Sequence, residues 1–252
     1  MRSLQKALDI IERIAESKNV GIRKLAAMTG FPPATIHRII TVLSERHYVE
    51  QDPATRKYSL SFRILELGAK LQQQSQLVAK ARPYLEDLMA DTRESANLAV
   101  RDGDEMVYVD HVPSDYSLLQ LFTRIGARVP LYNTGVGKVF LSTMNPRELE
   151  EYLQRTAIKR QTPHTLTTKV DIQKELKRIR ERGFAVDNEE LEIGVRCIAA
   201  LVYGHDGQPT GSISVSGAAV RITDERIEEL ARMVKNAASA VSRDQGFTSR
   251  QP

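Results

Sequence analysis

The sequence lacks the features that mark several specialised classes of protein. Its 252 residues include one cysteine, which excludes an intramolecular disulfide framework and a zinc module built from several cysteines. The longest uninterrupted apolar run, Cys197–Tyr203, has seven residues, whereas a membrane-spanning helix needs about 20. Residues 1–19 carry charges throughout and contain no apolar segment typical of a secretory signal. These absences predict a cytoplasmic protein with no membrane partner.

Patterns that hold metals or cofactors are also scarce. The five histidines show no recognisable ligand spacing with the cysteine or with carboxylates, so no metal is expected. Residues 133–138, Asn-Thr-Gly-Val-Gly-Lys, partly match a phosphate-binding loop. The first glycine of that motif is missing, however, and Lys138 is followed by valine. The sequence therefore predicts no nucleotide hydrolysis, no cofactor and no catalytic residue.

What the chain does have is an ordinary globular composition with an uneven distribution of charge. Hydrophobic residues make up 41% and charged residues 27%, which fits a folded protein rather than a disordered one. Residues 1–80 hold 13 Lys and Arg against 7 Asp and Glu, whereas the rest of the chain is close to neutral. A basic N-terminal third of this kind suggests a module that binds a polyanion.

Three helices are predicted within the first 45 residues. Apolar residues three and four positions apart predict an amphipathic helix over 3–16. A second, short helix begins at Ile22 and ends at Gly30, and a third runs from Pro33 to about Glu45. Two helices joined by a tight, glycine-containing turn are typical of a helix-turn-helix. The polar outer face of the third helix is either a solvated surface or one that contacts phosphates and base edges.

A basic hairpin is predicted directly after these helices. Residues 48–51 and 56–60 have the character of strands, and Asp52–Thr55 form the turn. Arg56 and Lys57 at its tip would neutralise phosphates beside a DNA groove. This order of elements favours DNA binding over a merely basic surface. The predicted DNA-binding residues are Arg23, Pro33, Ala34, Thr35, His37, Arg38, Thr41, Arg56 and Lys57.

The remaining chain combines helices with strands that arrive as hairpins. Residues 61–74 are expected to form an exposed linker helix that serves as a spacer or a dimer contact. Further helices are expected over 77–92 with a break near Arg82 caused by Pro83, over 134–144, from 145, over 170–182 and over 222–242. Strands are expected over 97–101, 106–111, 118–122, 184–188, 195–203 and 212–217. This pattern predicts an α+β domain with a largely antiparallel sheet.

Several separated segments resemble the IclR family of bacterial transcription regulators. They are residues 81–100, 187–190 with 194–200, and 212–217, and residues 30–40 are similar to the entry of that family's recognition helix. The likeness runs from about Leu4 to Val241, although Leu201 and Ala218 stand where the family often has proline. It implies a winged helix-turn-helix over 1–60, a linker helix over 61–76 and a GAF-like effector-binding domain over 77–245. It also implies a dimer or a dimer of dimers.

The resemblance further implies the position of an effector site. The N–H groups of Gly135 and Val136, with Asp187, Cys197, Ser214 and Ser216, would hold a small carboxylic or hydroxylated acid. Leu118, Leu121, Val129, Val195 and Val215 would form its apolar wall, or belong to an ordinary core. From the residues alone, Ser214 and Ser216 share one face of a strand, and the glycines at 135 and 137 indicate a helix cap. Cys197 is a buried structural thiol, a nucleophile or part of the pocket.

The predicted function is a ligand-responsive transcriptional regulator that binds double-stranded DNA. It would bind a pseudo-palindromic operator as a dimer or dimer of dimers, and a small organic acid would modulate that binding. Two alternatives remain open. One is a small-molecule enzyme or sensor that uses an activated Cys197, and the other is an architectural DNA-binding protein without a ligand.

Overall fold

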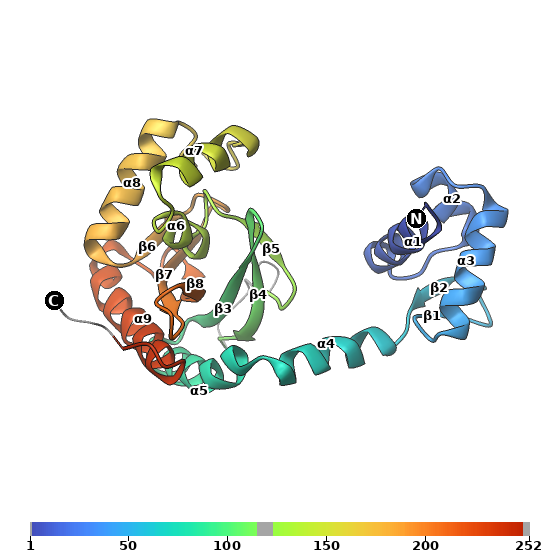
Figure 1. The fold of residues 1–252 in the computed structure, drawn as a ribbon, viewed down its shortest axis with the longest axis horizontal. Coiled ribbons are helices and arrows are strands. Elements are labelled where there is room, and N and C mark those ends of the chain that lie inside the picture. The colour runs from blue at the N-terminus through green and yellow to red at the C-terminus, as the bar shows by residue number, and fades with distance from the viewer. Residues whose placement is uncertain (1, 115–122, 249–252) are drawn as a thin grey trace. The chain divides into compact units, whose positions relative to one another are not determined.

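The computed structural model describes residues 2–114 and 123–248. The chain divides into two compact units between Gln74 and Ser75, and Figure 1 labels the helices and strands of each. Among the described residues, no helix is both long enough and apolar enough to cross a membrane.

The first unit is built on three helices: α1 (Arg2–Ser17), α2 (Ile22–Thr29) and α3 (Pro33–Glu45). Gly30 ends α2 in the left-handed conformation (φ 71°), and its N–H donates to the Ala26 carbonyl. Pro33 opens α3, at a position where a helix needs no donor. The helices enclose a core whose fully buried members are Ile10, Ile14, Val20, Leu25, Ile36 and Ile40.

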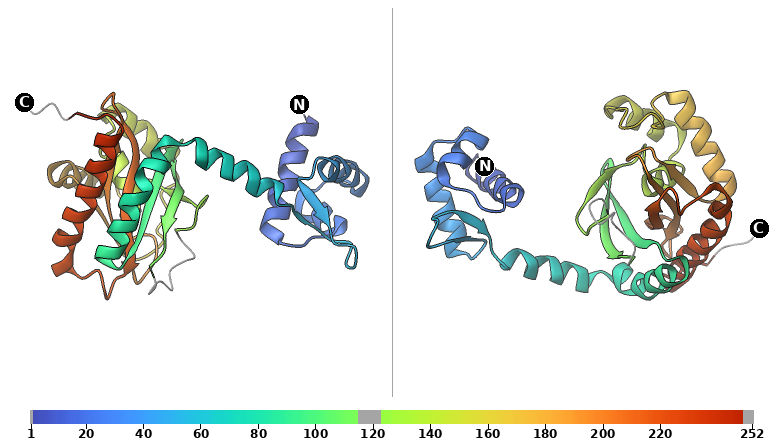
Figure 2. Two further views of the ribbon diagram at one scale, coloured as in Figure 1. Left: turned by 90° about the horizontal axis from the view of Figure 1, so that it is seen from below. Right: turned by 180° about the vertical axis from the view of Figure 1, so that it is seen from behind.

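A two-stranded hairpin follows α3, and its turn projects from the three helices (Figure 2). Its strands are β1 (Val49–Gln51) and β2 (Tyr58–Leu60), paired antiparallel. Tyr58 also exchanges two backbone hydrogen bonds with Val20, which anchors the hairpin on the helices. Arg56 and Lys57 lie in the turn rather than in the second strand, because Arg56 has φ 56° and cannot continue an extended strand. Helix α4 (Arg63–Gln74) ends the unit.

The second unit is centred on a six-stranded sheet in the order β5-β4-β3-β8-β7-β6, in which all neighbours are antiparallel. The strands are β3 (Ser95–Asp102), β4 (Glu105–Val112), β5 (Arg128–Pro130), β6 (Ala185–Asn188), β7 (Val195–Tyr203) and β8 (Pro209–Ala218). The expected α+β class, a winged helix-turn-helix with an antiparallel-sheet domain, is confirmed.

Helices cover both faces of this sheet. On one face α5 (Gln76–Thr92) and α9 (Asp224–Asp244) enclose a core that includes Leu98, Ile198, Ile213 and Val215. On the other face α6 (Gly135–Leu141) packs against β7 and β8, with α8 (Lys169–Arg182) outside it. Helix α7 (Pro146–Arg155) follows α6. The core of this second face includes Ala99, Tyr108, Val136 and Ala199.

Two expectations about the elements of this unit need correction, and one cannot be compared. Helix α5 is continuous through Pro83 and has no break at Arg82, because Ala81, Leu85 and Leu88 on its inner face are buried against the sheet. Strand β5 was not expected; its three residues pair with β4 after the turn at Gly126. The expected strand over 118–122 lies outside the described residues.

Candidate functional sites

The structure gathers six of the predicted DNA-binding residues on α3. Ile36, Ile40 and Leu43 face the core of the first unit, so the opposite face of the helix points to solvent. On it, Pro33, Ala34, His37, Arg38 and Thr41 are exposed and Thr35 is half-buried. The Thr41 hydroxyl donates to the His37 carbonyl at 2.9 Å, which leaves its oxygen to accept from a partner.

Four of the predicted DNA-binding residues are cations that lie on α2, on α3 and in the hairpin turn. Arg23, Arg38, Arg56 and Lys57 are all exposed, and none of them forms an ion pair with a described residue. By contrast, Arg13 on α1 lies 2.8 Å from Glu16, and Arg63 on α4 lies 2.8 Å from Glu66. These four cations are therefore available to phosphates.

In the second unit, strand register brings the predicted polar effector residues together. Cys197 on β7 is directly opposite Asp187 on β6 and Ser216 on β8. Ser214 lies two residues before Ser216 and opposite Asn97 on β3. Residues opposite one another in a sheet, or two apart on a strand, share a face. Asp187, Cys197, Ser214 and Ser216 are all buried, on the face covered by α6.

A hydrogen-bonded cluster connects these side chains to two residues not singled out from the sequence. Asn97 is fully buried, and its Nδ2 donates to Ser214 Oγ at 3.2 Å and to Ser216 Oγ at 3.1 Å. Its Oδ1 lies 2.8 Å from His111 Nδ1 on β4. The signal for Asn97 in the sequence is a polar residue directly before the apolar residues 98–100, and its partner strand could not be identified from the sequence.

The environment of Cys197 does not suit a nucleophile. Burial, together with the nearby Asp187 carboxyl, raises the pKa of its thiol to about 12, so the reactive thiolate is disfavoured. The thiol donates to Ser216 Oγ at 3.1 Å. His111, which reaches the cluster through Asn97, forms no hydrogen bond with Cys197 among the described residues. Cys197 therefore acts here as a hydrogen-bond donor.

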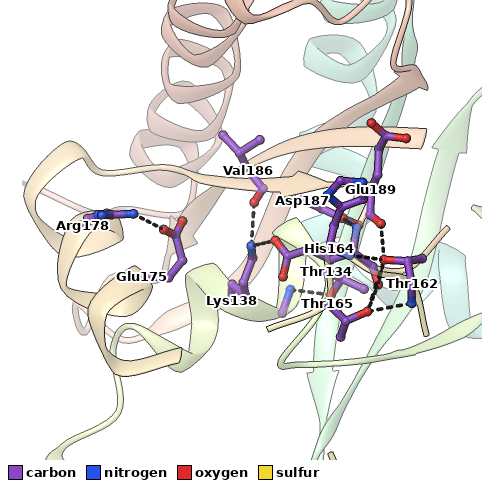
Figure 3. A network of polar contacts seen from close by, with 12 residues as sticks. Thr134, Lys138, Thr162, His164, Thr165, Glu175, Arg178, Val186, Asp187 and Glu189 are labelled. Carbon is purple, nitrogen blue, oxygen red and sulfur yellow. Dashed lines mark hydrogen bonds and ion pairs between the residues drawn. The ribbon is translucent and has the colours of Figure 1, made fainter. Parts of the chain in front are cut away.

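Asp187 belongs to a buried charged group that also includes Lys138 of α6 and Glu190. Figure 3 shows Lys138 reaching from α6 to the Val186 carbonyl, to which it donates at 2.6 Å; it also forms an ion pair with Glu190. Asp187 Oδ1 accepts the Glu190 N–H at 2.8 Å. Burial raises the pKa of the Asp187 carboxyl to about 7, although the Lys138 ammonium opposes this shift.

Helix α6 lies directly on the strand that carries Cys197. A Cβ atom at Gly135 would lie 3.4 Å from Ala199 Cβ and 3.5 Å from the Cys197 carbonyl oxygen, which are ordinary van der Waals distances. Thr134 caps the helix by accepting the Gly137 N–H at 3.1 Å. Val136 is buried in the core beneath α6.

The predicted apolar wall is only partly brought together. Val129 on β5 belongs to the same buried cluster as Val136, and Val195 is half-buried two residues before Cys197. Val215 is not part of this wall, because strand alternation places it on the opposite face, in the core under α5 and α9. Leu118 and Leu121 lie outside the described residues.

One predicted effector residue, Val129, lines a surface hollow of the second unit. A surface hollow of about 650 Å³ is lined by residues 124–130 with Gln161, Leu191 and Glu192, and Val129 is the only predicted effector residue in that lining. Within residues 2–114 and 123–248, no three His, Cys, Asp or Glu side chains are grouped so as to hold a metal ion.

Models of two protein domains match the chain. The IclR helix-turn-helix domain matches residues 3–53, which include α1, α2, α3 and β1. The model described as bacterial transcriptional regulator IclR C-terminal matches residues 69–243, which include the whole sheet and α6.

Relatives extend the similarity over the whole chain. The HTH-type transcriptional regulator KdgR of Escherichia coli is 33% identical over 97% of this chain and 93% of its own length. The transcriptional repressor IclR of E. coli is 32% identical over 96% of this chain and 89% of its own. The crystal structure of Thermotoga maritima IclR aligns with a TM-score of 0.83 and 33% identity, covering 98% of this chain and all of that one.

Proposed function

Because the chain belongs to the IclR family of bacterial transcriptional regulators, we propose that it binds a pseudo-palindromic operator as a dimer or dimer of dimers, under the control of a small organic acid. As a member of that family it is a DNA-binding regulator with a C-terminal effector-binding domain, and it is not an enzyme. The symmetry of the operator, the assembly and the chemistry of the effector are the proposed parts.

The exposed face of α3 and its neighbouring cations carry the proposal. Arg38 projects from the exposed helix face, and Arg56 and Lys57 project from the turn that follows. A recognition helix supplies contacts to base edges, and flanking cations supply contacts to phosphates. Arg23 at the start of α2 adds another cation that forms no ion pair with a described residue.

Exposed apolar side chains support a symmetric assembly. Leu4 and Leu8 on α1 are 68% and 51% exposed, and Leu65 and Leu71 on α4 are 66% and 72% exposed. Apolar surface of this kind is stabilised when a second copy covers it. A dimer formed in this way presents two recognition helices, which explains why we expect an operator with two half-sites.

The buried polar face of the sheet supports an organic-acid effector. Asp187, Cys197, Ser214 and Ser216 place four polar side chains beneath α6, next to buried apolar residues such as Val136 and Ala199. A few convergent polar groups in apolar surroundings are typical of a small-molecule site. An effector that binds two arrangements of the dimer unequally would change operator affinity.

Selection from a random double-stranded DNA library tests the operator. We expect the recovered sequences to share an inverted repeat, and we expect affinity to fall steeply as salt rises. Light scattering of the protein, alone and with the selected duplex, measures the assembly. Recovery of no common sequence, or of a single half-site bound by a monomer, would contradict the proposal.

A further inference from the structure

Two adjoining surface hollows lie at the end of β7 in the second unit. The first, of about 310 Å³, is bordered by α6, α8 and α9, and the second, of about 630 Å³, by the end of α9 and residues 246–248. Leu201, Tyr203 and Ser239 line both hollows. We propose that together they form a binding site for an organic anion that carries an aromatic ring.

This site is separate from the proposed effector face. Cys197 and Tyr203 are six residues apart on β7, which is about 20 Å at the rise of an extended strand. Helix α6 begins at Gly135 beside Cys197, whereas Ser142 at its other end lines the first hollow. None of the predicted effector residues that the structure describes lines either hollow. The inference therefore goes beyond the proposed function and does not depend on it.

Cations line both hollows. Arg180 and Lys235 line the first and Arg243 the second, and all three side chains are exposed. In the part of the chain that the structure describes, no Asp or Glu side chain lines either hollow, and none forms an ion pair with these cations. A bound anion would therefore meet three positive charges that no described carboxylate neutralises.

Backbone carbonyls hold two of these cations in place. Arg180 Nη1 donates to the Ser142 carbonyl at 3.1 Å, and Lys235 Nζ donates to the Arg182 carbonyl at 3.2 Å. These carbonyls lie at the ends of α6 and α8, and a helix end carries about half of a negative charge, so each cation exceeds the charge beside it. Arg180 retains its Nε and Nη2 hydrogens, and Lys235 retains two ammonium hydrogens, for a ligand.

Apolar and aromatic side chains line the rest of the hollows. Val139, Ile179 and Ala238 are buried in the lining of the first. The ring of Tyr203 stacks on that of Phe247, with centroids 5.1 Å apart, and both side chains are half-buried, so a ligand ring can pack against them. Burial raises the pKa of the Tyr203 hydroxyl, which therefore keeps its hydrogen and can donate to an anion. A mostly apolar lining with a few polar groups is typical of a small-molecule site.

A single fluorophore can report binding here, because the sequence contains no tryptophan. Phe247→Trp keeps an aromatic ring beside Tyr203 and places a lone tryptophan at the second hollow; Thr248→Trp in the same lining replaces it if that variant does not fold. The probe is 4-iodobenzoate, whose iodine quenches tryptophan emission on contact, so a molecule bound at Cys197, about 20 Å along β7, is not detected. We expect saturable quenching of the full-length protein and at least fivefold tighter binding of this acid than of neutral 4-iodobenzamide.

Charge variants in this background test the role of the cations. Arg180→Gln and Lys235→Gln should each weaken binding of 4-iodobenzoate at least threefold and leave binding of the amide unchanged, because they remove an attraction for the carboxylate. Lys174→Gln and Arg232→Gln are the matched controls, since these exposed cations lie on α8 and α9 but line neither hollow. Both controls should bind the acid as tightly as the parent. Lys235→Gln decides the question if Arg180→Gln does not fold, as judged by circular dichroism.

Three results would contradict the inference. The first is quenching that rises linearly with probe concentration and does not saturate, as random collisions produce. The second is equal affinity for the acid and the amide, and the third is equal weakening by the control and the lining variants, which would mean that only net charge matters. Saturable quenching that prefers the acid, and that only Arg180→Gln and Lys235→Gln weaken, supports the inference. None of these results bears on whether an effector binds beneath α6.

Discussion

The carboxyl group of Asp187 lies on the face of the sheet covered by α6, and its charge depends on pH. It is buried, and Lys138 and Glu190 pack against it from α6 and from the segment after β6. Cys197 and Tyr108 face it from β7 and β4, and it raises the pKa of each of them. Burial raises the pKa of Asp187 from 3.8 to about 7, so at neutral pH the folded protein is divided between the acid and the carboxylate.

Replacing Asp187 by Asn should remove a pH dependence of stability. Between pH 4 and 7 the unfolded chain ionises this group while the folded chain keeps it protonated. Its contribution to the free energy of unfolding is therefore greatest below pH 4 and declines as pH rises through 7. We expect Asp187→Asn to gain stability relative to the wild type as pH increases from 5 to 8, as measured by urea unfolding followed by circular dichroism.

Asp104→Asn provides the matched control. Asp104 lies in the same unit, and its hydrogen bonds with Arg155 lower its pKa. It is ionised in both the folded and the unfolded chain above pH 5, so its replacement should produce a difference that is constant from pH 5 to 8. A constant difference for Asp187→Asn as well would contradict the assignment of a raised pKa to Asp187.

Arg38 is expected to contribute specific binding energy at the operator. Arg38→Ala should weaken binding of the selected duplex by roughly tenfold or more, because a guanidinium contact to a guanine edge is worth about 1–3 kcal/mol. Fluorescence anisotropy at fixed salt measures the change. Arg13→Ala removes the same charge from α1, where it is already paired with Glu16, and should have little effect. Equal losses for the two variants would indicate that only net charge matters.

For single residues, the sequence predicted which side chains are polar site candidates better than it predicted where each side chain lies. Alternation along 212–217 placed Ser214 and Ser216 on one face, and the structure agrees. The same alternation excludes Val215 from that face, and this could have been read from the sequence. The positions of Asn97 and His111 could not be predicted, because their contacts depend on which strands pair with β3. Asn97 and Ser214, for example, are more than 100 residues apart in the sequence but lie opposite one another in the sheet.

Gly137 in α6 packs directly against the backbone of the segment that leads into this helix. A Cβ atom at Gly137 would lie 2.4 Å from the Leu131 Cα atom, which belongs to the backbone and cannot move independently. Gly137→Ala should therefore destabilise the second unit by about 1–3 kcal/mol or more, and it should disturb the packing of α6 on β7. Urea unfolding followed by circular dichroism measures the loss.

Gly68 allows a matched comparison within another helix. It lies inside α4, and a Cβ atom there would have no neighbour within 4 Å. Gly68→Ala should be neutral or stabilising by up to about 1 kcal/mol, because alanine has the higher helix propensity. If Gly137→Ala is as well tolerated as Gly68→Ala, the close approach to Leu131 does not restrict position 137 to glycine.

Helices and strands were predictable where local signals agree with tertiary packing. Strand β7 has its expected bounds because its apolar run coincides with a central strand of the sheet. Pro83 removes one donor from α5, but the buried contacts of Ala81 and Leu85 keep the helix continuous. Strand β5 has three residues, too few for a pattern of period two, and it exists through its pairing with β4.

The two units of the molecule have separate hydrophobic cores. In the first unit the core is enclosed by α1, α2 and α3, and in the second the cores lie on the two faces of the sheet. The proposed DNA-binding residues and the proposed effector residues therefore belong to different cores. Any influence of the effector on DNA is a coupling between distinct sites, and such a coupling must act equally in both directions.

Reciprocity supplies the test at the scale of the whole protein. With an acid that binds in a thermal-shift screen of small organic acids, we expect saturating acid to change operator affinity by a factor of roughly 5 to 150, and saturating operator to change acid affinity by the same factor. Anisotropy measures the first factor and calorimetry the second. Ser216→Ala should retain operator affinity but lose the response, whereas Arg38→Ala should bind the acid normally. A ligand that binds both arrangements of the dimer with equal affinity does not change the equilibrium between them. An operator affinity that saturating acid does not alter would therefore favour an architectural DNA-binding protein instead.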